Sequence, residues 1–173
     1  MNNRLAQHMM EIATDGTNIC ESVCQLVSED GKVYVVEPRR FLITNETVVG
    51  LDMNSHREST IRTLDRLVDT VFDEKADYTL HYLPTAEDIR LGIKAIAGRK
   101  YGTKVIWSDG IITINARLLL KAMSALNARV CYVGKNNTKM PIAFFKDDDV
   151  QSETIELIMP VINYGNKIGF WEV

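Results

Sequence analysis

Hydrophobic residues recur with helical spacing in four stretches of the chain. The apolar stripe of each stretch lies opposite polar residues, which is typical of a helix that buries one face. The four stretches are residues 3–13, 61–72, 85–97 and 116–126. Turn and capping residues bound them: Asp15-Gly16 ends the first, a capping box from Ser55 to Glu58 precedes the second, and Gly98 ends the third. Thr85 with Asp88 caps the third helix, and Asn115 caps the fourth.

Shorter runs rich in β-branched and aromatic residues lie between turn signals and predict antiparallel strands. They are residues 32–36, 41–43, 47–49, 78–82, 105–107, 111–114, 130–133, 142–145 and 154–161. The order is one helix and a strand meander, two helices around a short strand, and then a second strand meander with its helix. Because a repeated unit usually gives a pseudo-symmetric architecture, we expect a single α+β domain built from two similar halves.

The composition of the chain does not favour nucleic-acid binding by its surface as a whole. The chain has 173 residues, 46% of them hydrophobic, a net charge of −3 and a pI of about 5.6. Such a chain can bury one good core, and its acidic balance does not indicate a nucleic-acid-binding protein as a whole. Any contact with DNA would have to come from a local basic face. Arg117, Lys121 and Ser124 form such a face opposite the apolar stripe of the last helix.

Catalytic and metal-binding signals are weak. The three cysteines, Cys20, Cys24 and Cys131, are an odd number without a CxxC pair, so we interpret them as reduced core thiols. The cluster 147–149 of three aspartates could hold Mg²⁺, but consecutive side chains in a turn diverge, which favours a solvated hairpin tip. No phosphate loop or catalytic motif is present, so we predict a non-enzymatic protein without a metal or cofactor. Since the sequence also lacks a signal peptide and any membrane-length apolar run, we expect it to be soluble and cytoplasmic.

Several motifs of the second half have a family resemblance. Asn115 with the leucine-rich helix, Met140-Pro-Ile142 before a strand, and Met159-Pro160 at the closing strand resemble the last half-domain of a bacterial DNA sliding clamp. In the first half, 37–41 (Glu-Pro-Arg-Arg-Phe) is similar to an Asp-Gly-His-Arg-Leu loop of that family, with Pro replacing Gly and Arg replacing His. Ile162 stands where a terminal Arg is usual.

The resemblance covers roughly residues 3–50 and 104–163. It implies a single clamp-like domain, with both helices on an inner, DNA-facing side and the strands outside. We therefore divide the chain into four parts: a first clamp-like half (1–52), a two-helix insertion (53–103), a second clamp-like half (104–163) and a C-terminal extension (164–173). A clamp subunit has three such domains, and this chain has room for one.

The resemblance also implies two sites. The first is a DNA-facing set that contacts phosphates without reading bases, formed by Arg4, Arg117 and Lys121. The second is an outer pocket for clamp-binding-motif peptides of polymerase or repair proteins, formed by Val36, Pro38, Arg39, Arg40, Phe41, Leu157, Met159 and Val161. In a clamp the two halves of this pocket come from neighbouring domains. A one-domain chain is expected to join them only across a subunit contact, in a head-to-tail homo-oligomer that uses the strand edges at 47–49 and 130–133.

The resemblance thus implies a sliding-clamp-related accessory protein of DNA replication or repair, a processivity factor that binds double-stranded DNA without sequence preference. An alternative is a partner-binding module, acting as a decoy or scaffold, that keeps the clamp fold but does not encircle DNA. An enzyme that uses the acidic turn is a third, less favoured hypothesis.

Overall fold

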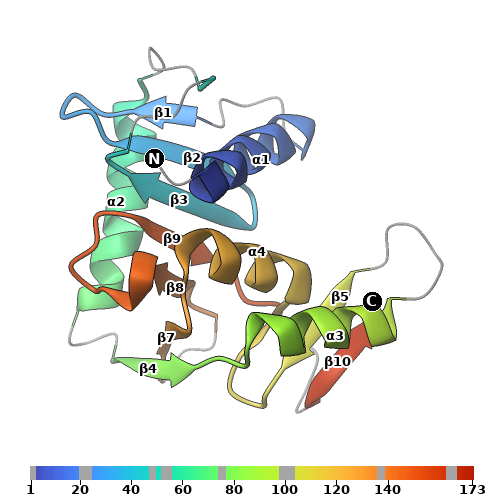
Figure 1. Cartoon of the computed structure of the whole chain (residues 1–173). Helices are drawn as coiled ribbons and strands as arrows, with labels where there is room; N and C mark the ends of the chain where they lie inside the picture. The colour runs from blue at the N-terminus through green and yellow to red at the C-terminus, as the bar shows by residue number, and fades with distance from the viewer. Residues whose placement is uncertain are drawn as a thin grey trace.

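The computed structural model describes residues 3–19, 25–46, 50–51, 56–73, 77–97, 104–135, 139–162 and 167–173, and Figure 1 shows their arrangement. In chain order the elements are α1 (Asn3–Ile19), β1 (Gln25–Val27), β2 (Val33–Glu37), β3 (Arg40–Thr44), α2 (Glu58–Phe72), β4 (Tyr78–Tyr82), α3 (Ala86–Ile96), β5 (Val105–Ser108), β6 (Thr113–Asn115), α4 (Ala116–Leu126), β7 (Val130–Gly134), β8 (Ile142–Phe145), a 3₁₀ turn η1 (Lys146–Asp148), β9 (Ile155–Ile158) and β10 (Gly169–Glu172). The fold is α+β with antiparallel sheets, as the sequence predicts.

The larger sheet has seven strands in the order β1-β2-β3-β9-β8-β7-β4. The first half of the chain supplies β1, β2 and β3, and the second half supplies β7, β8 and β9. The two meanders meet through their last strands, because β3 pairs antiparallel with β9 and places Phe41 opposite Leu157. This mirrored order is the pseudo-symmetric arrangement that the internal duplication predicts.

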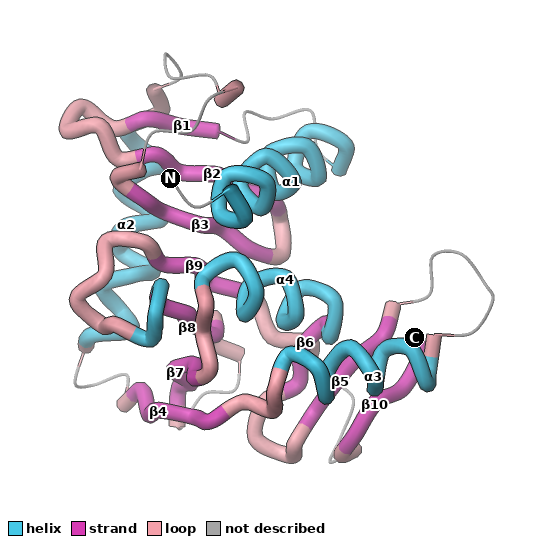
Figure 2. Tube along the Cα trace, viewed as in Figure 1, coloured by secondary structure: helices cyan, strands magenta, loops and turns pink. Residues whose placement is uncertain are grey.

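Alternate residues of the sheet pack into two separate cores. On the inner face, strand residues such as Val33, Val35 and Leu42 pack with residues of α1, α3 and α4. On the outer face, Tyr34 and Phe41 pack with α2. Because successive side chains of a strand point to opposite faces, one hydrophobic strand can serve both cores. The result is a three-layer structure, with α1 and α4 on one side of the sheet and α2 on the other (Figures 1 and 2). α3 lies beside α4, over β5 and β10.

Residues 53–103 contribute to both faces and to one edge of this sheet. The apolar stripe of α2 packs on the outer face, as the spacing predicts, with Ile61, Leu64 and Val71 buried. The Tyr34 hydroxyl fixes the helix further by donating a hydrogen bond to Asp65 at 2.9 Å. β4 pairs with β7 and so extends the main sheet, while α3 packs on α4 on the inner face.

The C-terminal residues join a small second sheet of order β10-β5-β6. β10 pairs with β5 and places Phe170 opposite Trp107. Phe170 also packs against α3 at Gly92, where any Cβ atom would overlap the Phe170 ring. A glycine in the middle of a helix normally costs about 1 kcal/mol relative to alanine. Here its small size allows β10 to lie close to α3.

A hydrogen-bonded aspartate ties the main sheet to the β5–β6 hairpin. Asp109 accepts hydrogen bonds from the backbone amides of Ile111 and Ile112, both at 3.0 Å, and from His81 of β4. Burial acts to raise the pKa of Asp109, but these hydrogen bonds outweigh it and hold the pKa below its usual value. The carboxylate therefore stays charged and keeps its partners in place.

Some of the sequence predictions about helix ends and strand edges are wrong. α1 does not end at Asp15-Gly16 but continues to Ile19. α2 begins at Glu58 after Arg57, which makes no side-chain cap, instead of after a capping box from Ser55. The segment 130–133 is not a free edge, because β7 lies between β8 and β4.

Some predicted features lie outside the described residues. These are Cys20, Cys24, the strand 47–49, Ser55 and Gly98.

Candidate functional site

The α4 helix presents a basic face because its start and its buried side are both fixed. The Asn115 side-chain oxygen accepts hydrogen bonds from the amides of Arg117 at 3.0 Å and Leu118 at 3.3 Å, which sets the first turn. The apolar side is buried against the sheet, with the residues Leu118, Leu119, Ala122, Met123, Ala125 and Leu126. Arg117 is therefore left exposed, and Lys121 half-buried, on the side away from the sheet.

The structure brings two of the three predicted DNA-facing residues to one groove. α1 and α4 pack side by side on the inner face (Figure 1). Arg4 and Lys121 line the groove between them. This groove has a volume of about 320 Å³ and is lined by Arg4, Gln7, His8, Glu11, Lys121, Ser124 and Ala125. Arg117 lies one turn before Lys121 on the same helix and does not line it.

A carboxylate modifies the charge of the α1–α4 groove. The Lys121 ammonium forms an ion pair with Glu11 of α1, in which both side chains keep about 40% of their surface exposed. Such exposed pairs contribute only about 0.2–1 kcal/mol, so a phosphate could replace Glu11 at small cost. Arg117 makes no ion pair with any part of the chain that the structure describes.

Beneath α1 lies a buried cluster of charged side chains. His8 Nε2 and Glu156 Oε2 are 2.7 Å apart, and Arg40 extends between Glu156 and Glu37. Arg40 Nε lies 3.2 Å from Glu37 Oε1, and its Nη2 donates a hydrogen bond of 3.2 Å to Asp15. Arg40 Nη1 and Glu156 Oε1 are 3.8 Å apart, which is beyond hydrogen-bond distance. The cluster therefore connects α1 to the two central strands, β3 and β9.

The two halves of the predicted outer pocket meet within one chain. We expected them to join only across a subunit contact, but β3 and β9 are neighbours, so this expectation is wrong. The backbone amide of Met159 also donates a hydrogen bond of 2.7 Å to the carbonyl of Arg39. The predicted strand 154–161 ends earlier, at Ile158, so Met159 and Val161 lie beyond it.

The predicted pocket residues differ in exposure. Phe41 and Leu157 are buried in the outer core with α2, and the Arg40 side chain has no exposed surface. Val36 is half-buried at the margin of the same core. The more accessible members are Pro38, Arg39, Met159 and Val161. A peptide that contacted Phe41 or Leu157 would have to displace α2.

The aspartates of the turn 147–149 fix the segment that follows the C-terminal end of α4. Asp147 accepts a hydrogen bond from the Asn127 side chain at 2.8 Å, and Asp148 accepts from the amides of Arg129 and Val130 at 2.9 and 3.1 Å. Asp149 accepts a hydrogen bond from the backbone amide of Gln151, within the same turn. The three carboxylates thus take three different sets of partners instead of converging.

Other chemistry is limited among the residues that the structure describes. They contain no group of three or more His, Cys, Asp or Glu side chains placed to hold a metal ion. Burial raises the pKa of the Cys131 thiol, which keeps it protonated and unreactive. None of the described helices has the length and apolar character needed to cross a membrane.

Comparisons with known proteins give matches among solved structures. The sequence matches no family model, and no curated protein is significantly similar to it. A protein of Eubacterium rectale, described as a DNA polymerase III beta subunit, is similar over 78% of this chain and 42% of its own length, with 14% identity and a TM-score of 0.40. The DnaN sliding clamp of Bartonella birtlesii, solved with griselimycin, is similar over 76% and 41%, with 11% identity and a TM-score of 0.40.

The DNA polymerase sliding clamp of Pseudomonas aeruginosa is similar over 79% of this chain and 43% of its own, with 11% identity and a TM-score of 0.36. The chain thus spans about two fifths of the length of these structures. All three structures are described as sliding clamps or as a DNA polymerase III beta subunit, the family that the sequence motifs resemble.

Proposed function

We propose that this protein is a non-enzymatic, sliding-clamp-related accessory factor of DNA replication or repair. Its inner helix face contacts the phosphate backbone of double-stranded DNA without reading the bases. The observation that carries the proposal is the side-by-side packing of α1 and α4, which gathers Arg4 and Lys121 at one groove and leaves Arg117 exposed beside it. Long cations on one face of a protein are what phosphate contacts require.

The acidic net charge does not oppose this function, because the charges are unevenly placed. α4 carries two cations and no carboxylate, and the fold directs its polar side away from the sheet. The single carboxylate at its groove, Glu11, is bound to Lys121. Phosphate recognition therefore has a basic helix available, although the chain as a whole carries −3.

Charge reversal on α4 tests the proposal. We expect the double substitution Arg117→Glu and Lys121→Glu to abolish binding of a labelled DNA duplex, since both cations are replaced by groups that repel phosphate. Wild-type affinity should fall steeply with salt and show no sequence preference, because each neutralised phosphate releases a counterion. The matched control is Arg62→Glu with Arg66→Glu on α2, which changes the net charge equally on the opposite side of the sheet.

The substitution Glu11→Gln is expected to change DNA affinity in the opposite direction. It removes the carboxylate from the α1–α4 groove and frees Lys121, so binding should strengthen at low salt. Fluorescence anisotropy over a salt series measures both arms, and thermal unfolding by circular dichroism checks that the variants remain folded. Equal binding by the wild type, the α4 variant and the α2 control would contradict the proposal.

A second candidate function is a clamp-fold module that binds partners, as a decoy or scaffold, without encircling DNA. One observation favours it: β4 covers the β7 edge that we expected a ring to use. In that case the wild-type protein would show no salt-dependent DNA binding, while a clamp-binding-motif peptide would still bind near Arg39 and Met159.

A further inference from the structure

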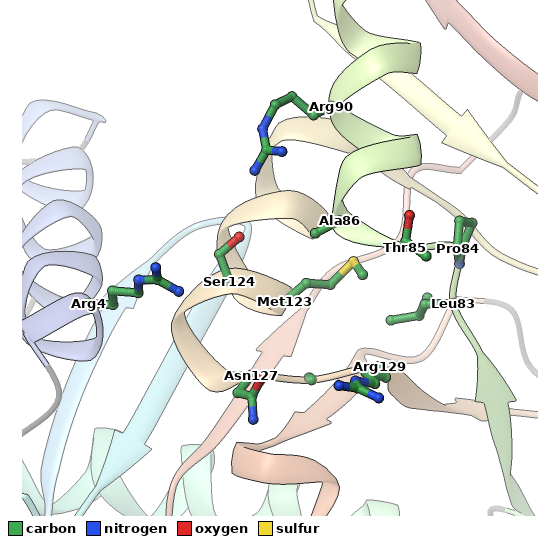
Figure 3. Close-up of a pocket in the computed structure, with 11 residues that line it drawn as sticks. Arg4, Leu83, Pro84, Thr85, Ala86, Arg90, Met123, Ser124, Asn127 and Arg129 are labelled. Atoms are coloured by element: carbon green, nitrogen blue, oxygen red, sulfur yellow. The ribbon is translucent and has the colours of Figure 1, made fainter.

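A second groove on the inner face is lined by arginines from three separate elements. It lies between α4, α3 and the start of α1, and has a volume of about 480 Å³ (Figure 3). Arg4 comes from α1, Arg90 from α3, and Arg129 from the turn that follows α4. The other lining residues are Leu83, Pro84, Thr85, Ala86, Met123, Ser124, Asn127 and Ala128. We call it the arginine groove.

The arginine groove differs from the neighbouring grooves in charge. Three guanidinium groups line it, and no carboxylate does. The α1–α4 groove includes Glu11. Two grooves beside α2 on the outer side are lined by several carboxylates each: Glu29, Asp30 and Glu58 in one, and Asp65, Asp69 and Glu153 in the other. The arginine groove is therefore the one of these four that most favours an anion.

The side chains are placed for an extended anion instead of a point charge. In Figure 3, Arg4 and Arg90 reach toward α4 from two sides, while Arg129 lies at the far end of the groove beside Leu83. Met123, Leu83 and Pro84 give the groove an apolar wall. A guanidinium can hold two oxygens of a phosphate at once, and an apolar wall tolerates a sugar.

The existing partners of Arg90 and Arg129 do not prevent such contacts. Arg90 pairs with Glu87 one turn earlier, and both side chains are more than half exposed. An exposed pair of this kind contributes little, and a phosphate can replace it. Arg129 uses its backbone amide for Asp148, and its guanidinium makes no ion pair with the described parts of the chain.

A purely structural role accounts for one of the three arginines. Arg129 lies near the C-terminal end of α4, where cations interact favourably with the last carbonyl groups. This role would make the Arg129 side chain matter for stability. It gives no reason for Arg90, which belongs to another helix, to line the same groove.

We infer that the arginine groove binds the phosphodiester backbone of double-stranded DNA, so that α3 widens the DNA-facing surface beyond α1 and α4. This inference rests on the proposed function, because it names a second contact for the same ligand. The two surfaces share Arg4, but Arg90 and Arg129 belong to the arginine groove alone.

The test neutralises those two arginines and leaves α4 and Arg4 unchanged. For Arg90→Gln with Arg129→Gln, we expect weaker binding of a labelled duplex and a smaller dependence of log K on log salt. Each lost phosphate contact should lower that slope by about 1. The matched control is Arg62→Gln with Arg66→Gln on α2, which should bind as the wild type does.

The outcomes separate the two claims. A groove variant with wild-type affinity and slope, alongside a defective Arg117→Glu and Lys121→Glu variant, overturns the arginine groove and leaves the proposed function standing. The reverse pattern supports the groove and overturns α4 as the contact. A wild-type protein that binds no duplex overturns both. If Arg129→Gln lowers the melting temperature, the DNA binding of the single variant Arg90→Gln decides between these outcomes, because the Arg90 side chain is exposed and its loss should not affect folding.

Discussion

Arg40 lies at the centre of the charges buried beneath α1. Its side chain has no exposed surface, and neither have those of Glu37 and Glu156, which lie on either side of it. A buried carboxylate that loses its cation has no water to replace it, so its charge becomes strongly unfavourable. The family resemblance assigns Arg40 to a peptide pocket, whereas the structure gives it a stabilising role between β3, β9 and α1.

Replacing Arg40 should therefore destabilise the fold. For Arg40→Met, which keeps much of the volume and removes the charge, we expect the free energy of unfolding to fall by about 3–5 kcal/mol. The matched control is Arg39→Met, because Arg39 contacts the same Glu37 at 3.0 Å but keeps 40% of its side chain exposed. Its loss should cost about 1 kcal/mol or less. Urea unfolding followed by circular dichroism measures both, and equal losses would contradict the assigned role.

At the scale of elements, the sequence predicts a helix end correctly where neighbouring residues of the chain form its cap. The Asn115 cap of α4 and the Thr85–Asp88 capping box of α3 are both present, since each depends on residues within one turn. The end of α1 was predicted wrongly because Gly16 is buried within the helix, and packing there overrides its tendency to end one. The start of α2 was missed because Arg57 supplies no capping side chain.

The α2 helix offers a direct test of element packing. Leu64→Asp places a carboxylate in the outer core among Phe41, Leu157 and Phe145, where nothing compensates its charge. We expect the free energy of unfolding to fall by on the order of 3–5 kcal/mol. Thr63→Asp on the same helix is exposed and should change it by less than about 1 kcal/mol. A well-folded Leu64→Asp protein of near wild-type stability would mean that α2 does not pack on the sheet in solution.

At the scale of the whole molecule, the candidate site was only partly predictable. Arg117 and Lys121 could be found because they share one helix with a clear apolar stripe. Arg90 and Arg129 could not, since neither stretch of sequence is basic by itself. They reach the same groove only because α3 packs beside α4, which is a long-range contact with no local signal. The pairing of β4 with β7 is also a long-range contact, so the sequence did not predict it.

Assembly depends on which strand edges remain open. Within the described part of the main sheet, the outermost strands are β1 and β4. The amide of Lys135 donates a hydrogen bond to the carbonyl of Asp77, and the amide of Leu83 donates one to the carbonyl of Arg129. Because alternate residues of a strand direct their backbone groups to the same neighbour, residues 79 and 81 also direct theirs toward β7. The amides of Tyr78, Leu80 and Tyr82 consequently point away from the sheet. β4 carries no proline, and 45% of Leu80 is exposed, so this edge is open to pairing with a second chain.

If the protein forms the homo-oligomer that the resemblance implies, we predict that β4 is one of its contacts. Leu80→Pro removes an outward amide and should shift the solution mass toward the monomer with little loss of thermal stability, because proline is tolerated at an edge. Thr79→Pro is the matched control: it removes an amide that faces β7, so it should lower the melting temperature. Analytical ultracentrifugation over the micromolar range gives the mass. A wild-type protein that is monomeric throughout, or an oligomer unaffected by Leu80→Pro, would exclude assembly through this edge.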